Sequence, residues 1–311
     1  MKSTSHDRLD LLDTFVRIVD AGSLSAAARQ LGTTQPTVSR RLQALETTLG
    51  VRLVQRSTHG LRLSEDGAHC YRQARQLLTD WEAFEDALRG AEAEPEGVLR
   101  VMAPHAFGQD QLLEPLERYL RRYPAMSVEW VLSDRVPDFV AEGIDCAIRV
   151  GTVEEPSTVA LRLGEVQRIV VAAPELIGKA PVETPERLAD LPWIALSQFY
   201  HDALRLARID TGESRLVEIR PRLVTENLYV TRNAVLRGLG CALLSSWIVR
   251  EDLAAGRLAH LLPDWRAAPL PIYLIYPYSR FYPGRLRHFV ELIREASDRM
   301  LGDAHAPAPE G

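Results

Sequence analysis

Arginine residues crowd into one short part of the chain, where they could bind an anionic partner. Between residues 29 and 63 the sequence holds six arginines and one acidic residue, Glu46, although the whole chain of 311 residues has a net charge of −5. Guanidinium groups at this density suit contact with nucleic-acid phosphates, an electrostatic contact that does not depend on base sequence. A solvated basic surface without a partner is the alternative, and charge alone does not decide between them. The arginines are Arg29, Arg40, Arg41, Arg52, Arg56 and Arg62.

The apolar pattern in this region predicts which side chains face outward. An apolar residue recurs every three or four positions between Thr34 and Gly50, which predicts a helix with one buried stripe. The stripe consists of Val38, Leu42, Leu45 and Leu49. The other side of the helix carries Gln35, Pro36, Thr37, Ser39, Arg40 and Gln43. Because Gln and Arg can pair with adenine and guanine edges in the major groove, this side is a candidate DNA-reading surface.

Two shorter helices are expected to hold this helix in place. Their apolar positions are Leu9, Leu12, Phe15, Val16 and Val19 in the first and Leu24, Ala27, Ala28 and Leu31 in the second. Gly22 and Gly32 follow these helices, and Ser23 can cap the start of the second. A tight glycine turn sets the third helix at a steep angle to the second, which lets its N-terminal end enter a major groove.

A hairpin is predicted beyond Gly50. Residues 51–56 and 61–63 read as two short strands around a turn at 57–60. Arg52 and Arg56 on this wing would contact DNA phosphates. Residues 1–63 are therefore expected to form a winged helix-turn-helix, the DNA-binding domain of the chain.

The run from Phe15 to Gly67 closely resembles the N-terminal domain of LysR-type transcriptional regulators. The matching residues, in order and spacing, are Ala26–Ala28, Leu31–Gly32, Gln35–Pro36, Val38–Arg40, Leu45–Glu46, Leu49–Gly50 and Glu65–Gly67. The resemblance implies that the operator is read by Gln35, Pro36, Thr37, Ser39 and Arg40, supported by Arg52 and Arg56. Thr34, Thr37, Val54 and Ser57 stand where the family more often has Ser, Ala, Phe and Thr. We expect these departures to change base preference without abolishing DNA binding.

A long linker helix is predicted over residues 64–91, with Ser64 as its cap. Its seam residues recur with alternating spacings of four and three, the pattern of a coiled coil, and are Gly67, Tyr71, Ala74, Leu78, Trp81, Glu85 and Leu88. Dimerisation is expected through Tyr71, Ala74, Leu78, Trp81 and Leu88, and a helix packed only on its own domain is the alternative. Pairing would present two reading helices to an inverted-repeat operator on double-stranded DNA. The family resemblance implies a dimer or a dimer of dimers.

An α/β effector-binding domain is expected over residues 98–311, after an acidic linker at 92–97. Strand-like runs cover 98–102, 128–132, 146–150, 169–172, 193–196, 217–224 and 241–244, and helical runs cover 111–122, 226–237 and 284–300. The segments GVLRVMAPHAFG, LLEPLERYLRRYPAMSVEWVLSD and GIDCAIRVG resemble the effector domain of the same family. The resemblance implies a two-lobed fold like type 2 periplasmic binding proteins, with lobe I at about 98–168 and 271–301 and lobe II at about 169–270. The chain is expected to cross between the lobes near 169–173 and 267–270.

Loops that follow the strands of this domain are the expected site of a small-molecule effector. Ligands of open α/β sheets bind beyond the carboxyl ends of the strands, where helix N-termini offer free N–H groups and partial positive charge. This rule and the resemblance select Pro104, His105, Phe107, Ser133, Arg149, Gly151, Thr152, Ser197, Gln198, Thr225 and Asn227. A small organic anion is the expected class of effector. Arg149 is either its clamp or a structural ion-pair partner.

Motifs for catalysis and metal binding are absent from the sequence. It lacks GxSxG, HExxH, GxxxxGK[ST] and paired CxxC motifs, so we expect no enzyme activity, catalytic residue, metal or cofactor. Cys146 and Cys241 lie in apolar runs and are expected in the core, although a redox-sensing thiol is an alternative. An alternative function for the whole chain is a solute-binding protein whose N-terminal domain serves only dimerisation.

The sequence also bears on where the chain works. The first residues lack the apolar region of a signal peptide, and no run reaches the roughly 18 apolar residues of a membrane span. The three cysteines, Cys70, Cys146 and Cys241, are too few and too widely spaced for a disulfide framework. We therefore expect a cytoplasmic protein with no membrane partner, and RNA polymerase is a further candidate partner.

Overall fold

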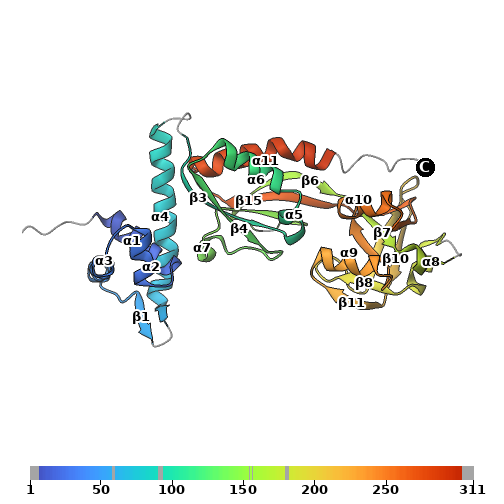
Figure 1. The fold of residues 1–311 in the computed structure, drawn as a ribbon, viewed down its shortest axis with the longest axis horizontal. Helices are drawn as coiled ribbons and strands as arrows, with labels where there is room; N and C mark the ends of the chain where they lie inside the picture. Colours follow the sequence, from blue (N-terminus) through green and yellow to red (C-terminus); the bar gives the residue numbers. More distant parts are fainter. Residues whose placement is uncertain are drawn as a thin grey trace, which may run out of the picture.

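The computed structural model describes residues 7–57, 60–89, 94–153, 155, 157–178 and 182–302. Three parts follow one another along the molecule in Figure 1: a small helical unit with a hairpin, a long helix, and two α/β lobes. The long helix stands between the helical unit and the first lobe, and the second lobe lies at the far end. No helix in the described ranges is long and apolar enough to cross a membrane.

The N-terminal unit places three helices before a hairpin. Its elements are α1 (Arg8–Asp20), α2 (Leu24–Gln30), α3 (Gln35–Leu49), β1 (Val54–Ser57) and β2 (Gly60–Leu63). Ser23 caps α2 as predicted, since its hydroxyl accepts the Ala26 N–H at 3.2 Å. Gly50 has a φ of 72°, in the left-handed region that favours glycine, and ends α3.

The core of this unit departs from the predicted apolar faces at two places. In α1, Leu11 and Ile18 are buried, whereas Leu9 and Leu12 are only half-buried. In α3 the predicted stripe is buried except at Leu49, which is 47% exposed, so the prediction is wrong at its last position. Leu49 immediately precedes Gly50, where the backbone turns out of the helix.

The wing begins later than the sequence predicted. β1 starts at Val54 and not at Val51, and the Leu53 and Val54 N–H groups donate to the Glu46 carboxylate at 2.8 and 3.3 Å. β1 and β2 pair antiparallel, with Val54 opposite Leu63. Thr58 and His59 of the predicted turn lie outside the described residues, as does the side chain of Arg56.

The first half of α4 (Glu65–Arg89) packs on the N-terminal unit. Tyr71 and Ala74 are buried in the core of that unit, and Leu78 packs against it. A β-carbon at Gly67 would lie 1.9 Å from the Leu53 carbonyl oxygen, so this close approach requires glycine. The prediction that Tyr71 and Ala74 mediate dimerisation is therefore wrong, because the same chain already covers them.

The second half of α4 exposes a different set of apolar residues, named here the apolar stripe. Leu77, Trp81, Phe84 and Leu88 are 54%, 44%, 44% and 72% exposed. At 100° per residue these four positions fall within about 60° around the helix. Relative to the predicted seam, Leu77 and Phe84 take the places of Leu78 and Glu85. The Trp81 and Phe84 rings lie 5.7 Å apart.

The opposite side of α4, named here the polar face, is bonded to the first lobe. Arg75 Nη2 donates to the Gly143 carbonyl at 2.9 Å. Glu82 pairs with Arg285 at 2.5 Å, and Asp86 accepts the Gly284 N–H at 2.7 Å. Arg75, Glu82 and Asp86 fall within about 40° around the helix. They are spread over about three turns of the helix, so α4 is fixed along this length.

The first lobe is built on a mixed sheet with strand order β4-β3-β5-β15-β6. Its strands are β3 (Gly97–Ala103), β4 (Met126–Leu132), β5 (Cys146–Val150), β6 (Thr158–Val166) and β15 (Leu270–Pro277). Its helices are α5 (His105–Gln109), α6 (Leu113–Arg122), α7 (Phe139–Glu142) and α11 (Gly284–Gly302). β3 runs parallel to β4 and β5, whereas β15 runs antiparallel to β5 and β6. Leu99, Tyr119, Phe289 and Ile293 are fully buried between the sheet and its helices.

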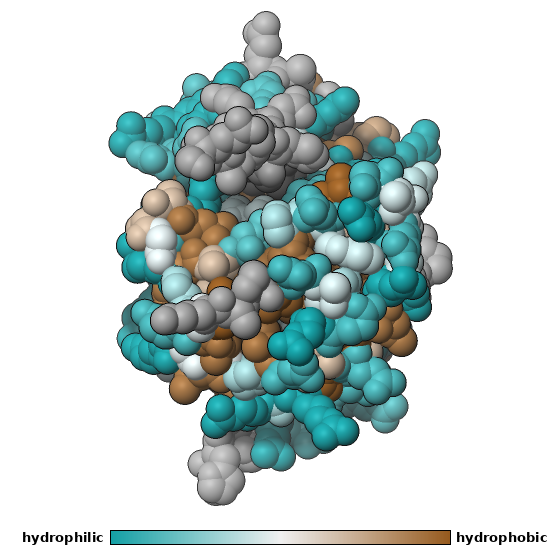
Figure 2. Space-filling model, turned by 90° about the vertical axis from the view of Figure 1, so that its right-hand side faces the viewer, coloured by the Kyte–Doolittle hydropathy of each residue, from teal (hydrophilic) through white to brown (hydrophobic). Residues whose placement is uncertain are grey.

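The second lobe has three small sheets, with strand orders β12-β7-β13, β11-β8 and β10-β9-β14. Its strands are β7 (Arg168–Ala172), β8 (Trp193–Leu196), β9 (Ala203–Arg208), β10 (Ser214–Glu218), β11 (Pro221–Thr225), β12 (Ala242–Ser245), β13 (Ala259–Leu261) and β14 (Trp265–Ala267). Its helices are α8 (Pro174–Ile177), the 3-10 helix η1 (Pro185–Asp190), α9 (Leu228–Leu236) and α10 (Ser246–Ala254). Figure 2 views the molecule from the end at which this lobe lies, and hydrophilic residues cover most of that face.

The chain passes between the lobes at two short connections. Gln167 alone separates β6 of the first lobe from β7 of the second, so residues 169–172 lie inside a strand and not at a crossing. The return runs from β14 through Ala268 and Pro269 to β15. The single strand predicted over 217–224 is two strands, because the chain leaves β10 before Pro221 begins β11.

Candidate DNA-reading surface and ligand cleft

The outward side of α3 gathers the residues that the sequence selected for reading DNA. Gln35, Pro36, Arg40 and Gln43 are exposed, and Thr37 and Ser39 are half-buried. Val38, Leu42 and Leu45 hold the opposite side of the helix on the core. These six outward residues, named here the reading face, therefore project from one rigid element.

Three side chains at the start of α3 are linked to each other. Thr34 stands at the cap position but does not cap the helix with its side chain, which bonds the Thr37 hydroxyl at 2.9 Å. Arg40 Nη2 donates to the same Thr37 hydroxyl at 3.4 Å. The guanidinium of Arg40 is thus drawn toward the N-terminal end of α3, the end that enters a major groove in this fold.

A groove runs between the start of α2, the reading face and the wing. It is lined by Gly22, Ser23, Leu24, Ser39, Leu42, Gln43, Glu46, Arg52, Val54 and Leu61. The Arg52 side chain is 87% exposed at its edge, 3.9 Å from the Glu46 carboxylate. Arg41 does not join this surface, because it is half-buried and donates to the Thr14 hydroxyl at 3.3 Å.

Glu46 has a structural role that the sequence analysis missed. Its side chain is 11% exposed, and its carboxylate accepts the two N–H groups that begin the wing. The wing and the reading helix are therefore tied together by one side chain. An isolated acidic residue within a basic, apolar region was the signal that could have indicated it.

A cavity lies between the two lobes. It is lined by Pro104, Ala106, Phe107, Asp134, Val150, Arg168, Leu196, Gln198, Phe199, Tyr200, Glu226, Leu228, Leu243, Ser245 and Leu270. Its open space of about 50 Å³ has room for only a few water molecules. This space is smaller than the sites that usually hold an organic molecule.

Three of the eleven residues predicted for the effector line this cavity, namely Pro104, Phe107 and Gln198. In the first lobe, Arg149 Nη1 donates to the Asp134 carbonyl at 2.6 Å, and His105 Nδ1 lies 2.8 Å from the Asp134 carboxylate. Ser133 accepts the Arg135 N–H, Gly151 lies in the loop after β5, and Thr152 is exposed. Arg149 is thus hydrogen-bonded to a backbone carbonyl of its own lobe.

The predicted residues of the second lobe mostly stabilise the start of α9. Asn227 caps this helix by accepting the Val230 N–H at 3.0 Å, and the Thr225 hydroxyl accepts the Asn227 N–H at 3.2 Å. The Ser197 N–H donates to the Thr225 carbonyl at 3.0 Å. Ser197, Thr225 and Asn227 are outside the cavity lining.

Arg168 is the cationic residue of the cavity lining, and the sequence analysis missed it. Its Nε and Nη2 donate to the Ala268 carbonyl at 3.1 and 2.7 Å, so it bridges the two connections between the lobes. Burial lowers the pKa of its guanidinium. Arg168 begins a strand, whereas the rule used on the sequence selects only residues that follow strands.

Aromatic packing joins the lobes behind this cavity. The Phe107 ring of the first lobe meets the Trp247 ring of the second at 5.1 Å between centroids. Ala106 of α5 belongs to the apolar core of the second lobe. The lobes are therefore in apolar contact on one side of the cavity.

Comparison with known proteins gives the chain its family. Residues 92–298 match the LysR substrate binding domain, and residues 9–68 match the bacterial regulatory helix-turn-helix protein, lysR family. The chain belongs to the LysR family. This confirms the resemblance and the predicted fold class, a winged helix-turn-helix followed by a LysR effector domain.

Proteins that are similar to this LysR family member over almost their whole length are named as transcriptional regulators. The HTH-type transcriptional regulator PtxR of Pseudomonas aeruginosa is 32% identical over 300 residues, 95% of each chain. The full-length structure of AphB, a Vibrio cholerae virulence activator, is 27% identical with a TM-score of 0.58 and covers 92% of this chain and 98% of its own. CrgA of Neisseria meningitidis, 28% identical with a TM-score of 0.58, covers 95% and 99%. The chain is a LysR-type transcriptional regulator, a non-enzymatic role, with a DNA-binding domain and an effector-binding domain.

Proposed function

We propose that this regulator reads a double-stranded DNA operator with the reading face of α3, while Arg52 and Arg56 of the wing contact phosphates. The division of α3 supports this most directly, because burial of one side leaves Arg40 and Gln43 exposed on the other. Arg can pair with a guanine edge and Gln with an adenine edge in the major groove. Arg40 would reach bases from the N-terminal half of the helix and Gln43 from just past its middle.

Arg40→Ala tests this assignment. Loss of the guanidinium is expected to weaken binding to an operator duplex, selected in vitro with the wild-type protein, by about 1 to 3 kcal/mol, a factor of roughly 5 to 150. The melting temperature should not change, because the side chain is exposed. Log affinity should fall linearly with log salt as counterions are released.

Arg121→Ala is the matched control, since Arg121 is 79% exposed on α6 in the first lobe. It removes the same charge from a surface that is far from α3 in Figure 1. An equal loss of affinity in both variants, or binding that does not depend on salt, would reject the assignment.

A second copy of the chain is the partner proposed for the apolar stripe of α4. Leu77, Trp81, Phe84 and Leu88 form a narrow apolar row of the kind that two helices bury against each other. Of the predicted dimerisation residues, Trp81 and Leu88 remain in this assignment. The pair would present two reading faces to the half-sites of an inverted repeat, and two pairs would form a dimer of dimers.

A small organic anion is the effector proposed for the cavity between the lobes. Arg168 supplies a half-buried cation, and Phe107, Leu196 and Phe199 supply apolar walls. Because the cavity is too small for such a molecule as it stands, binding would separate the lobes and so favour one arrangement over another. This preference for one arrangement of the lobes would couple effector binding to operator binding.

Two further assignments follow from DNA binding. The protein would work in the cytoplasm, where a bacterial chromosome lies. RNA polymerase is its candidate partner at the promoter. Neither assignment requires a membrane contact.

A further inference from the structure

The turn between the reading helix and the wing is built around Glu46 of α3. The Glu46 backbone carbonyl accepts the Gly50 N–H at 2.8 Å and the Val51 N–H at 3.2 Å. Its side chain reaches further along the turn, and Oε1 accepts the Leu53 and Val54 N–H groups at 2.8 and 3.3 Å. Four backbone donors of the turn are therefore satisfied by one residue of the reading helix.

The charge of this side chain is unfavourable for DNA binding. Glu46 is the only acidic residue between positions 29 and 63, and it lines the groove between the reading face and the wing. A carboxylate there is repelled by the phosphates of any duplex bound to this surface. Such a conflict with the surrounding charge marks a residue that has another role.

Arg52 is the cationic residue that this turn carries. Its side chain is exposed, and its Nη1 lies 3.9 Å from Glu46 Oε2. The two oxygens of Glu46 thus face different groups, Oε1 the backbone of the turn and Oε2 the guanidinium. An ion pair at this distance and exposure is weak, so the guanidinium is free to bind a phosphate. The bonds to Oε1 fix the place from which the Arg52 side chain extends.

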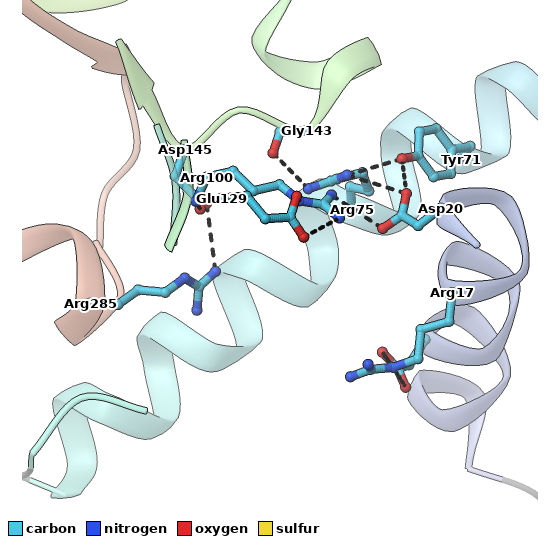
Figure 3. Close-up of polar contacts among 10 residues, drawn as sticks. Arg17, Asp20, Tyr71, Arg75, Arg100, Glu129, Gly143, Asp145 and Arg285 are labelled. Atoms are coloured by element: carbon cyan, nitrogen blue, oxygen red, sulfur yellow. Dashed lines mark hydrogen bonds and ion pairs between the residues drawn. The ribbon is translucent and has the colours of Figure 1, made fainter. Parts of the chain in front are cut away.

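α4 holds the backbone of Arg52 from the other side. The Ser64 hydroxyl donates to the Arg52 carbonyl at 2.6 Å, and the Ser64 N–H donates to the Leu53 carbonyl at 3.0 Å. α4 is itself bonded to α1, since the Tyr71 hydroxyl donates to Asp20 at the end of that helix, as Figure 3 shows. Because α1, α3 and α4 share one apolar core, the Arg52 side chain extends from a fixed point relative to the reading face.

We propose that Glu46 is a positioning residue for DNA binding, which places Arg52 at a phosphate while the reading face of α3 lies on the bases. The proposal rests on the DNA contacts proposed above for α3 and the wing. Phosphate contacts fix how a protein sits on the duplex, and base contacts then specify the sequence. Since Glu46 lies on the reading helix itself, it joins the two kinds of contact within one subunit.

Glu46→Ala and Glu46→Gln, compared in the full-length protein, test this role. Both remove the charge, but only glutamine keeps an oxygen that can accept the Leu53 and Val54 N–H groups. The measurement is affinity for a duplex with one half-site of the operator selected by the wild-type protein, over a range of salt concentrations. One half-site contacts one subunit, so the pairing of subunits does not affect the result.

The slope of log affinity against log salt is the deciding quantity. It is expected to fall by about 1 in Glu46→Ala, as for the loss of one phosphate contact, and to keep its wild-type value in Glu46→Gln. The affinity deficit of Glu46→Ala relative to Glu46→Gln should therefore shrink about three- to fourfold between about 50 and about 200 mM salt. A residue that only stabilised the fold would lower the melting temperature and leave the slope unchanged.

A double variant with Arg52→Ala shows whether Glu46 acts through that guanidinium. Arg52→Ala alone should lower the slope by about 1, and adding Glu46→Ala should lower it no further. Should Glu46→Ala fold poorly, Glu46→Asp takes its place against the wild type. This variant keeps the charge but withdraws the oxygens by the length of one methylene group, so it should also lower the slope.

Two results would overturn the positioning role of Glu46: an equal slope in Glu46→Ala and Glu46→Gln, or an added fall in the double variant. A wild-type slope in Glu46→Asp, where that variant replaces Glu46→Ala, has the same meaning. A wild-type slope in Arg52→Ala would instead overturn the phosphate contact proposed for the wing.

Discussion

The two sides of α4 differ in the kind of contact that they can make. The polar face is joined to the first lobe by charged groups, each with a defined donor and acceptor, such as Glu82 with Arg285 and Asp86 with the Gly284 N–H. The apolar stripe on the other side presents Trp81 and its neighbours to solvent. Hydrogen bonds between charged groups fix an angle, whereas apolar burial supplies free energy in proportion to area with little directionality. We interpret the polar face as setting the geometry within a subunit and the stripe as supplying affinity between subunits.

Trp81→Glu tests whether the apolar stripe joins subunits, and it is expected to have the largest effect. A carboxylate in the stripe would have to be buried unpaired on association, so the variant is expected to be a monomer by light scattering at micromolar concentration. Loss of paired binding should lower affinity for an inverted-repeat duplex by about 100-fold or more. Trp81→Phe, which keeps an apolar ring, should remain paired. A Trp81→Glu protein that still formed the wild-type dimer would show that the stripe is not the interface.

Gly143→Ala should weaken the polar face and leave the stripe intact. Gly143 has a φ of 65°, and a β-carbon would lie 1.7 Å from Arg75 Nη1. Strain and the displaced guanidinium are expected to lower the free energy of unfolding by about 1 to 3 kcal/mol, measured by urea denaturation. Gly238→Ala is the control, since its φ is 68° but its β-carbon would meet nothing within 4 Å. Equal losses in both variants would mean that the Arg75 contact adds no stability.

The smallest effect is expected in thiol labelling, which tests whether the apolar stripe ends before it reaches the first half of α4. Cys70 is half-buried in the first half of α4, and Cys146 and Cys241 are buried in the lobes. Burial raises the pKa of all three thiols, so little thiolate forms at neutral pH and labelling should be slower than for free cysteine and accelerate as pH rises. We expect one slow thiol per native chain, with a rate that changes less than about twofold in Trp81→Glu. A rapidly reacting thiol would instead favour the redox-sensing alternative.

The sequence predicted α3 well because its pattern is local. Val38, Leu42 and Leu45 lie within two turns of each other, and one face of a helix can be read from spacing alone. The same reasoning failed on α4, where Tyr71 and Ala74 fit a seam by spacing but are covered by the core of the N-terminal unit. Tertiary contacts decide which of two apolar faces a helix buries within its own chain.

The cleft was harder to predict than either helix. Pro104 and Phe107 follow a strand, so the general rule for α/β sheets selected them for the effector, and both line the cavity between the lobes. Arg168 reaches the same cavity from the connection between the lobes and is bonded to Ala268, a residue 100 positions further along the chain. A sequence gives no measure of such a distant pairing, and for the same reason Asn227 was assigned to a ligand when it caps a helix.

The division of labour within α3 also bears on how such proteins diversify. Its buried side alone holds the helix on the core, so residues such as Gln35, Pro36 and Gln43 can be exchanged at little risk to folding. After gene duplication, a few surface mutations in α3 would therefore be enough to change which promoters are bound, while the rest of the polypeptide keeps its fold.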